Sequence, residues 1–69
     1  MSDSVYKVIE LVGTSQESWE QAARNAIETA AAQLRDLRIA EVSQLDAQLE
    51  DGRIVRYRAK VKVSFRYER

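Results

Sequence analysis

The sequence contains no cysteine and no histidine among its 69 residues. Without cysteine the chain cannot form disulfides or bind a metal through thiolates, and without histidine it lacks the commonest metal ligand and general base. No serine stands in a sharp, glycine-flanked turn either, so no nucleophile and base can be paired and we expect a protein that is not an enzyme. A chain this short buries only about 60% of the surface that its unfolded form exposes. We therefore expect self-association to supply the missing stability.

Charge and hydropathy argue against two further classes of partner. The 11 basic and 11 acidic residues cancel, so the chain lacks the excess positive charge by which proteins attract nucleic acid. No apolar run approaches the about 18 residues of a membrane span. The first residues, MSDSVYK, do not follow the basic-then-apolar order of a secretory signal. We expect a cytoplasmic protein that binds neither nucleic acid nor membrane.

Three segments have the composition of strands. Residues 5–12, VYKVIELV, are rich in β-branched types and are followed by Gly13, which predicts a strand closed by a turn. Residues 39–50 alternate more weakly, and residues 55–68 alternate cleanly between apolar and polar side chains. The Asp51-Gly52 pair between the last two segments predicts a tight hairpin. This turn is a better interpretation of DAQLEDG, residues 46–52, than a calcium loop, because its acids lack the required spacing.

A helix is predicted between the first two strands. Thr14 and Glu17 have the spacing of a capping box, which predicts a helix that begins at Ser15. Apolar residues then recur at steps of three and four: Trp19, Ala22, Ala23, Ala26, Ile27, Ala30, Ala31, Leu34 and Leu37. Most of these are alanine, so the helix can lie close to the sheet. Trp19 continues the stripe, which favours packing over a role as a ligand platform.

The order strand, helix, strand, strand predicts one α+β domain over residues 1–69, with a three-stranded antiparallel sheet wrapped on one long helix. The helical crossover makes the first two strands parallel, so the third fits between them as the central strand. It is longer than the helix and should extend past it. The sheet face away from the helix then carries a row of cations: Arg56, Arg58, Lys60 and Lys62. The acids placed to balance them on neighbouring strands or subunits are Glu10, Glu41, Asp46 and Glu50.

The whole pattern resembles the dodecins, small strand-helix-strand-strand proteins that assemble into hollow spheres of twelve subunits. The resemblance covers residues 4–68. It rests on VYKVIELVGTS, the alanine-rich helix, AEV at 40–42, the Asp51-Gly52 hairpin, Tyr57 and KVSFRYE at 62–68. It implies a homododecamer in which neighbouring copies complete the burial of the sheet.

Flavin-binding dodecins carry a tryptophan at the start of the second strand, and here that position is Ile39. They also carry a glutamine on the last strand that hydrogen-bonds the flavin ring, and here that position is Arg58. An aliphatic side chain cannot stack on the ring and an arginine has no acceptor for the imide, so we expect weakened binding of riboflavin or FMN. Arg66 matches a basic position near the flavin phosphate in some bacterial dodecins, although an ion pair between subunits explains it equally well. The candidate cofactor-binding residues are Ile39, Glu41, Gln44, Arg58 and Arg66.

A second branch, the calcium dodecins, is closer to this chain. The shared features are GTS and SWEQAA around the helix start, Arg38, and an aliphatic residue at the position of Ile39. On this resemblance Ile39 is a packing residue and the cargo is calcium rather than flavin. Glu17 is the candidate metal ligand, with Glu10, Glu41 and Asp46 as further oxygen donors, and several subunits would have to contribute. A role without any cargo stays open, because the same acids can simply balance the cationic strand face.

Overall fold

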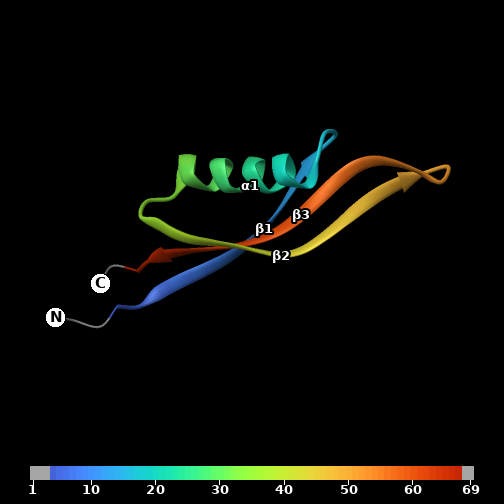
Figure 1. The fold of residues 1–69 in the computed structure, drawn as a ribbon. Coiled ribbons are helices and arrows are strands. Elements are labelled where there is room, and N and C mark those ends of the chain that lie inside the picture. The colour runs from blue at the N-terminus through green and yellow to red at the C-terminus, as the bar shows by residue number, and fades with distance from the viewer. Residues whose placement is uncertain (1–3, 68–69) are drawn as a thin grey trace.

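The computed structural model describes residues 4–67, so the ends of the predicted domain, residues 1–3 and 68–69, lie outside it. Four elements follow one another along the chain: β1 (Tyr6–Ser15), α1 (Trp19–Gln33), β2 (Leu37–Glu50) and β3 (Arg53–Arg66). The predicted β-α-β-β order is confirmed. Figure 1 shows α1 lying along one face of a long, twisted sheet, with the β2–β3 hairpin extending beyond the helix. No helix in the described range is long and apolar enough to cross a membrane.

The predicted sheet topology is also confirmed. The strand order is β1-β3-β2, and β3 pairs antiparallel with both neighbours. The hairpin turns at Asp51 and Gly52, whose φ angles are 51° and 75°. Two successive residues with positive φ form the turn whose twist matches that of paired strands, and aspartate followed by glycine is a preferred sequence for it. The long central strand therefore lies beside both edge strands.

The predicted start of the helix is wrong. β1 does not turn at Gly13 but continues through Thr14 to Ser15, because these residues still pair with β3. The helix begins at Trp19, and its N-cap is Ser18, whose hydroxyl accepts a hydrogen bond of 3.0 Å from the backbone N–H of Gln21. Ser18 and Gln21 have the same sequence spacing as Thr14 and Glu17, so the chain offered two candidate caps.

The predicted end of the helix is wrong as well. The apolar stripe was extended to Leu37, whereas α1 ends at Gln33 and Leu37 is the first residue of β2. The backbone N–H of Leu34 closes the last turn on the Ala30 carbonyl at 2.9 Å. Asp36 then adopts a φ of 60°, in the left-handed region that aspartate tolerates better than most residues. The helix therefore spans 15 residues, about four turns instead of the predicted six.

The core is small and lies between α1 and the middle of the sheet. It consists of Ala22, Ala26, Ala30, Ala59, Val61 and Val63. The three alanines from α1 confirm the predicted close-packed stripe, and the residues from β3 confirm the predicted helix-facing side of that strand. Gly13 on β1 lies against the same helix, since an added Cβ there would stand 2.0 Å from the backbone oxygen of Ala22.

Much apolar surface remains uncovered in one chain. α1 packs on β1 and β3 and barely touches β2, so Val42 and Leu45 remain 47% and 51% exposed. Leu49 and Ile54 near the hairpin are exposed too. The molecule measures 55 × 19 × 15 Å, an elongated form in which the sheet extends far past its helix (Figure 1). A stable domain with so little buried surface needs additional contacts.

Candidate functional site

All five candidate cofactor-binding residues lie on the face of the sheet that points away from α1, called here the open face. Directly paired residues in an antiparallel sheet share a face. Ala40 and Val42 pair with Val63 and Val61, which are buried beneath the helix. The alternating residues therefore lie on the open face, in the cross-strand pairs Ile39–Ser64, Glu41–Lys62, Gln44–Lys60 and Asp46–Arg58, and Arg66 follows the same alternation along β3.

A bulge in β2 brings Gln44 and Asp46 to this face. The register shifts between Val42 and Gln44, and the Ser43 hydroxyl donates a hydrogen bond of 3.2 Å to the Lys60 carbonyl. An extra residue at this point reverses the alternation of the strand. The apolar residues Ala40 and Val42 occupy even positions and Leu45 an odd position, so the reversal is visible in the sequence.

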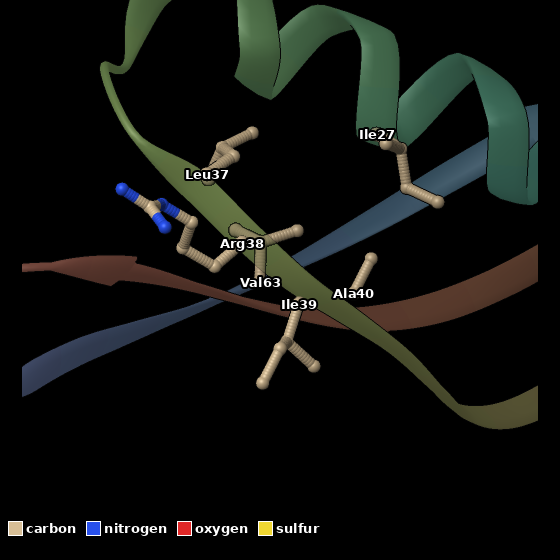
Figure 2. Close-up of a pocket in the computed structure, with 6 residues that line it drawn as sticks. All are labelled: Ile27, Leu37, Arg38, Ile39, Ala40 and Val63. Carbon is tan, nitrogen blue, oxygen red and sulfur yellow. The ribbon is translucent and has the colours of Figure 1, made fainter.

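Ile39 projects from the open face near the start of β2. Figure 2 shows its side chain directed away from α1, whereas Ala40 and Leu37 point toward the helix. A small hollow of about 150 Å³ lies beside this stretch. It is lined by Ile27, Leu37, Arg38, Ile39, Ala40 and Val63. Ile39 is 60% exposed. Within one chain it is therefore an apolar surface residue, and any packing role requires a partner or a ligand.

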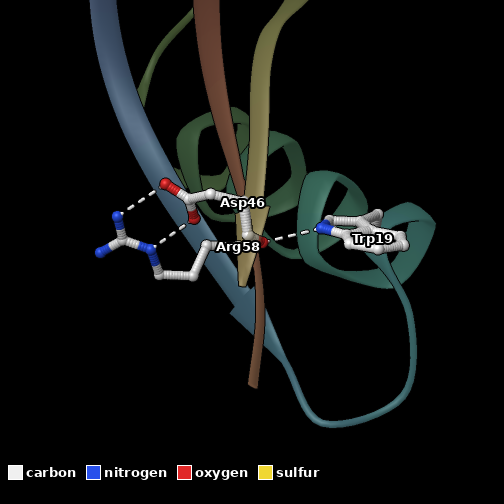
Figure 3. Close-up of polar contacts among 3 residues, drawn as sticks. All are labelled: Trp19, Asp46 and Arg58. Carbon is white, nitrogen blue, oxygen red and sulfur yellow. Dashed lines mark hydrogen bonds and ion pairs between the residues drawn. The ribbon is translucent and has the colours of Figure 1, made fainter. Parts of the chain in front are cut away.

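Asp46 and Arg58 form a two-point ion pair on the open face. The Arg58 Nε donates to Asp46 Oδ1 at 2.7 Å, and a terminal guanidinium nitrogen donates to Oδ2 at 2.9 Å. From the other side of β2, the indole Nε1 of Trp19 donates to the backbone carbonyl of Asp46 at 2.8 Å (Figure 3). The Trp19 ring also meets Tyr57 edge to face, with centroids 4.8 Å apart. The first turn of α1 is thus hydrogen-bonded to Asp46, the residue of β2 whose carboxylate binds Arg58.

Comparison with known proteins places this arrangement in a family. A family model described as Dodecin matches residues 5–68. The chain belongs to the dodecin family. It is 44% identical over 63 residues to the calcium dodecin of Mycobacterium tuberculosis, covering 91% of this chain and 89% of that protein.

Solved dodecins share the fold over the full length. The dodecin of Streptomyces coelicolor superimposes with a TM-score of 0.91 at 42% identity, covering 100% of this chain and 99% of that one. A calcium dodecin from M. tuberculosis, whose structure is described as having a novel calcium-binding site, gives a TM-score of 0.83 at 43% identity. The match covers 94% of this chain and 93% of that one. The predicted family is confirmed.

The acidic residues of this dodecin chain are spread over its surface. Glu10 and Glu41 face Lys62 from opposite sides on the open face, and two strand spacings put their backbones roughly 10 Å apart. Glu17 lies in the β1–α1 connection, where its backbone N–H donates to the Ser15 hydroxyl at 2.9 Å. Across residues 4–67, no three acidic side chains gather closely enough to hold a metal ion. Glu17 as a metal ligand stays a prediction that needs oxygen donors from other copies.

Of the predicted counter-charges, Asp46 is ion-paired with Arg58. Glu50 pairs in register with Arg53 at the hairpin, away from the predicted row of cations. Trp19 had been predicted to pack, and it does contact Tyr57 while remaining 39% exposed. Sequence reasoning did not predict its hydrogen bond to Asp46, because the two residues come together only when α1 docks on the sheet.

The Asp46–Arg58 ion pair gives a predicted pH dependence. The hydrogen bond from Arg58 lowers the pKa of Asp46 below its ordinary value of 3.8, and the charges of Arg58 and Lys60 add to this effect. A carboxyl whose folded pKa is lowered stabilises the folded state above its unfolded pKa, and that stabilisation disappears as the pH falls through the folded value. We expect a small loss of stability below about pH 4 that Asp46→Asn lacks, measured by urea unfolding at several pH values. Equal pH profiles for the two proteins would contradict it.

Proposed function

We propose that this dodecin chain assembles into a hollow homododecamer that binds a small ligand or ion without catalysing a reaction. The observation that carries this proposal is the exposed apolar surface on a chain whose core is six alanine and valine side chains. Neither disulfides nor histidine or thiolate metal sites are available to compensate, so contacts between copies are the remaining source of stability. Membership of the dodecin family supports the same conclusion.

The size of the assembly tests this proposal directly. Light scattering on the purified protein should give about twelve times the 7.9 kDa chain mass. A monomer or a dimer at micromolar concentration would contradict the shell and any cavity inside it. A cytoplasmic location and the absence of nucleic acid and membrane partners stay predictions from the sequence.

Calcium is the cargo that we favour. The support is the 44% identity to a protein named calcium dodecin, together with the aliphatic residue at position 39. Calcium takes about six to eight oxygen ligands, which the acids of a single chain do not bring together. We infer a site shared between copies, to which Glu17 contributes a carboxylate from the connection before α1.

A calcium titration of two charge-matched variants tests the role of Glu17. Glu17→Gln removes the proposed ligand and should weaken calcium binding about tenfold or more, since each lost carboxylate removes a charged oxygen donor. Glu28→Gln removes the same charge from the exposed side of α1 and should bind as the wild type does. Isothermal titration calorimetry on the assembled proteins measures both. Equal affinity in the two variants would show that Glu17 is not a ligand.

Flavin binding is the alternative, and one feature of the open face supports it. The structure places Ile39, Glu41, Gln44, Arg58 and Arg66 on this one face. The dodecin resemblance assigns flavin to these positions, with a stacking tryptophan where this chain has Ile39. Riboflavin fluorescence separates the two cargoes, because strong quenching near micromolar protein supports flavin and unchanged emission supports calcium or no cargo.

Restoring a ring at position 39 should strengthen flavin binding. The Ile39 side chain is 60% exposed and points away from the core, so tryptophan fits there without displacing α1. Ring stacking is worth about 0.5–1.5 kcal/mol beyond the area buried, and we expect Ile39→Trp to raise riboflavin affinity roughly tenfold. Ile39→Leu is the control, because it changes shape without adding a ring. An unchanged riboflavin affinity in Ile39→Trp would show that the missing ring is not the barrier.

A further inference from the structure

The open face carries balanced charge in its central part. Four successive rows cross the sheet there: Val8–Ser64–Ile39, Glu10–Lys62–Glu41, Val12–Lys60–Gln44 and Thr14–Arg58–Asp46. Three cations from β3, Arg58, Lys60 and Lys62, stand against three carboxylates, and their formal charges cancel. Any anion that approaches these rows meets no net attraction. Removing one carboxylate would give the rows a net positive charge.

Asp46 differs from the other two carboxylates in how it engages its cation. It binds Arg58 through both oxygens, at 2.7 and 2.9 Å. Two parallel hydrogen bonds of this kind use the same guanidinium edge that binds phosphate or a ligand carboxylate. Arg58 is therefore occupied by the chain itself, on the strand where the proposed ligand face is most cationic.

The backbone of Asp46 is also held by a residue of α1, which packs on the other face of the sheet. The Trp19 indole holds the Asp46 backbone carbonyl at 2.8 Å, and the Trp19 ring rests against Tyr57, the residue before Arg58. Figure 3 shows the two hydrogen-bonding partners of Asp46 on opposite sides of β2, with the Trp19 indole on one side and the Arg58 guanidinium on the other. The first turn of α1 thus contacts the Asp46 backbone directly and Tyr57, the residue next to Arg58, which positions the backbone of both partners of the ion pair.

We propose that Asp46 lowers the affinity of this dodecin for anionic ligands, by occupying the Arg58 guanidinium in the central rows of the open face. Asp46 is a specificity-determining residue that acts through Arg58 and does not itself contact the anionic ligand. The inference rests on the proposed function in that the open face is taken as the ligand face. With Asp46 in place, neutral or cationic cargo is favoured over phosphate-bearing cargo. With Asp46 neutralised, Arg58 becomes available to an anion.

Inorganic phosphate is a direct probe of this proposal. The ³¹P linewidth of free phosphate is compared for wild type, Asp46→Asn and the double variant Asp46→Asn/Arg58→Gln, each in its assembled form. An exposed ion pair contributes little, so the gain from freeing Arg58 should be small, and we expect Asp46→Asn to bind phosphate about two- to fivefold more tightly than wild type. The double variant should lose that gain.

The matched control is Glu20→Gln. Glu20 contacts Arg24 at 3.9 Å on α1, so this variant also adds one positive charge and also releases an arginine, but away from the sheet. We expect its phosphate broadening to equal that of wild type. Broadening in Glu20→Gln equal to that in Asp46→Asn would overturn the proposal, because added positive charge or the release of any arginine would then explain the gain without the open face. No gain in Asp46→Asn or in a second variant, Asp46→Ser, or a gain that survives Arg58→Gln, would overturn it too.

A flavin pair extends the test to a ligand. FMN and riboflavin differ by one phosphate, so the ratio of their affinities reports phosphate recognition separately from ring binding. We expect Asp46→Asn to shift this ratio about two- to fivefold toward FMN. If neither flavin binds any variant, flavin is excluded as cargo, and the phosphate measurement still decides the role of Asp46. An unchanged ratio in a variant that binds both flavins would count against the proposal.

Discussion

Replacing Gly13 by alanine should detach α1 from the sheet. A methyl group at this position would stand 2.0 Å from the Ala22 carbonyl oxygen and 2.9 Å from the Ala26 Cβ. Backbone atoms cannot rotate aside as the end of a long side chain can, so the whole helix would have to move. Ordinary overpacking costs about 1–3 kcal/mol, and we expect at least about 3 kcal/mol here because the obstacle is a helix backbone.

The measurement is thermal unfolding at a fixed protein concentration, because the midpoint of an oligomer depends on concentration. A loss of 3 kcal/mol should lower the unfolding midpoint by roughly 12 °C or more. Gly52→Ala is the control, since Gly52 has a φ of 75° but no atom within 4 Å of an added Cβ. It should cost only about 1–2 kcal/mol of backbone strain. A Gly13→Ala midpoint no lower than that of Gly52→Ala would show that α1 does not lie so close to β1.

The sequence predicted topology better than it predicted the ends of elements. The clean alternation of β3 and the Asp51-Gly52 turn depend on neighbouring residues alone, and both are confirmed. The helix start was wrong because Thr14 satisfies a local capping pattern, whereas pairing of Thr14 and Ser15 with β3 keeps them in β1. Thr14 and Ser15 therefore pair with residues more than 40 positions away in the sequence instead of forming a helix cap with Glu17. The turn predicted at Gly13 is wrong because Gly13 pairs with Ala59 in the same ladder.

The candidate site was predicted in part. The five candidate cofactor-binding residues were chosen from a resemblance, and the alternation of the strands, reversed by the bulge in β2, places them on one face. Asp46 was named as a counter-charge, but its two-point contact with Arg58 depends on the bulge at Ser43, which was not predicted. The hydrogen bond from Trp19 depends on how α1 docks. A linear pattern does not reveal contacts that depend on a bulge or on how the helix docks.

Placing glutamate at both Val42 and Leu45 should abolish the assembly and leave the separated chains less stable than those in the wild-type shell. Both side chains are about half exposed in the single chain, on a part of β2 that α1 barely touches. Substitution there removes little from the core of one subunit. If copies bury this surface, each buried apolar side chain contributes about 1.5–3 kcal/mol, and an unpaired charge in the interface adds a cost of several kcal/mol.

Light scattering should therefore report monomers or small oligomers for the Val42→Glu/Leu45→Glu double variant at concentrations where the wild type gives the full shell. Circular dichroism during heating should show the helix lost at a lower temperature than in the wild type, because the separated chains lack the contacts between copies. Leu45→Met is the matched control, because it keeps an apolar side chain of similar volume and should retain the wild-type mass. A double variant that keeps the full mass would show that this surface stays in solvent, and the shell would then have to be closed by the hairpin or by the open face.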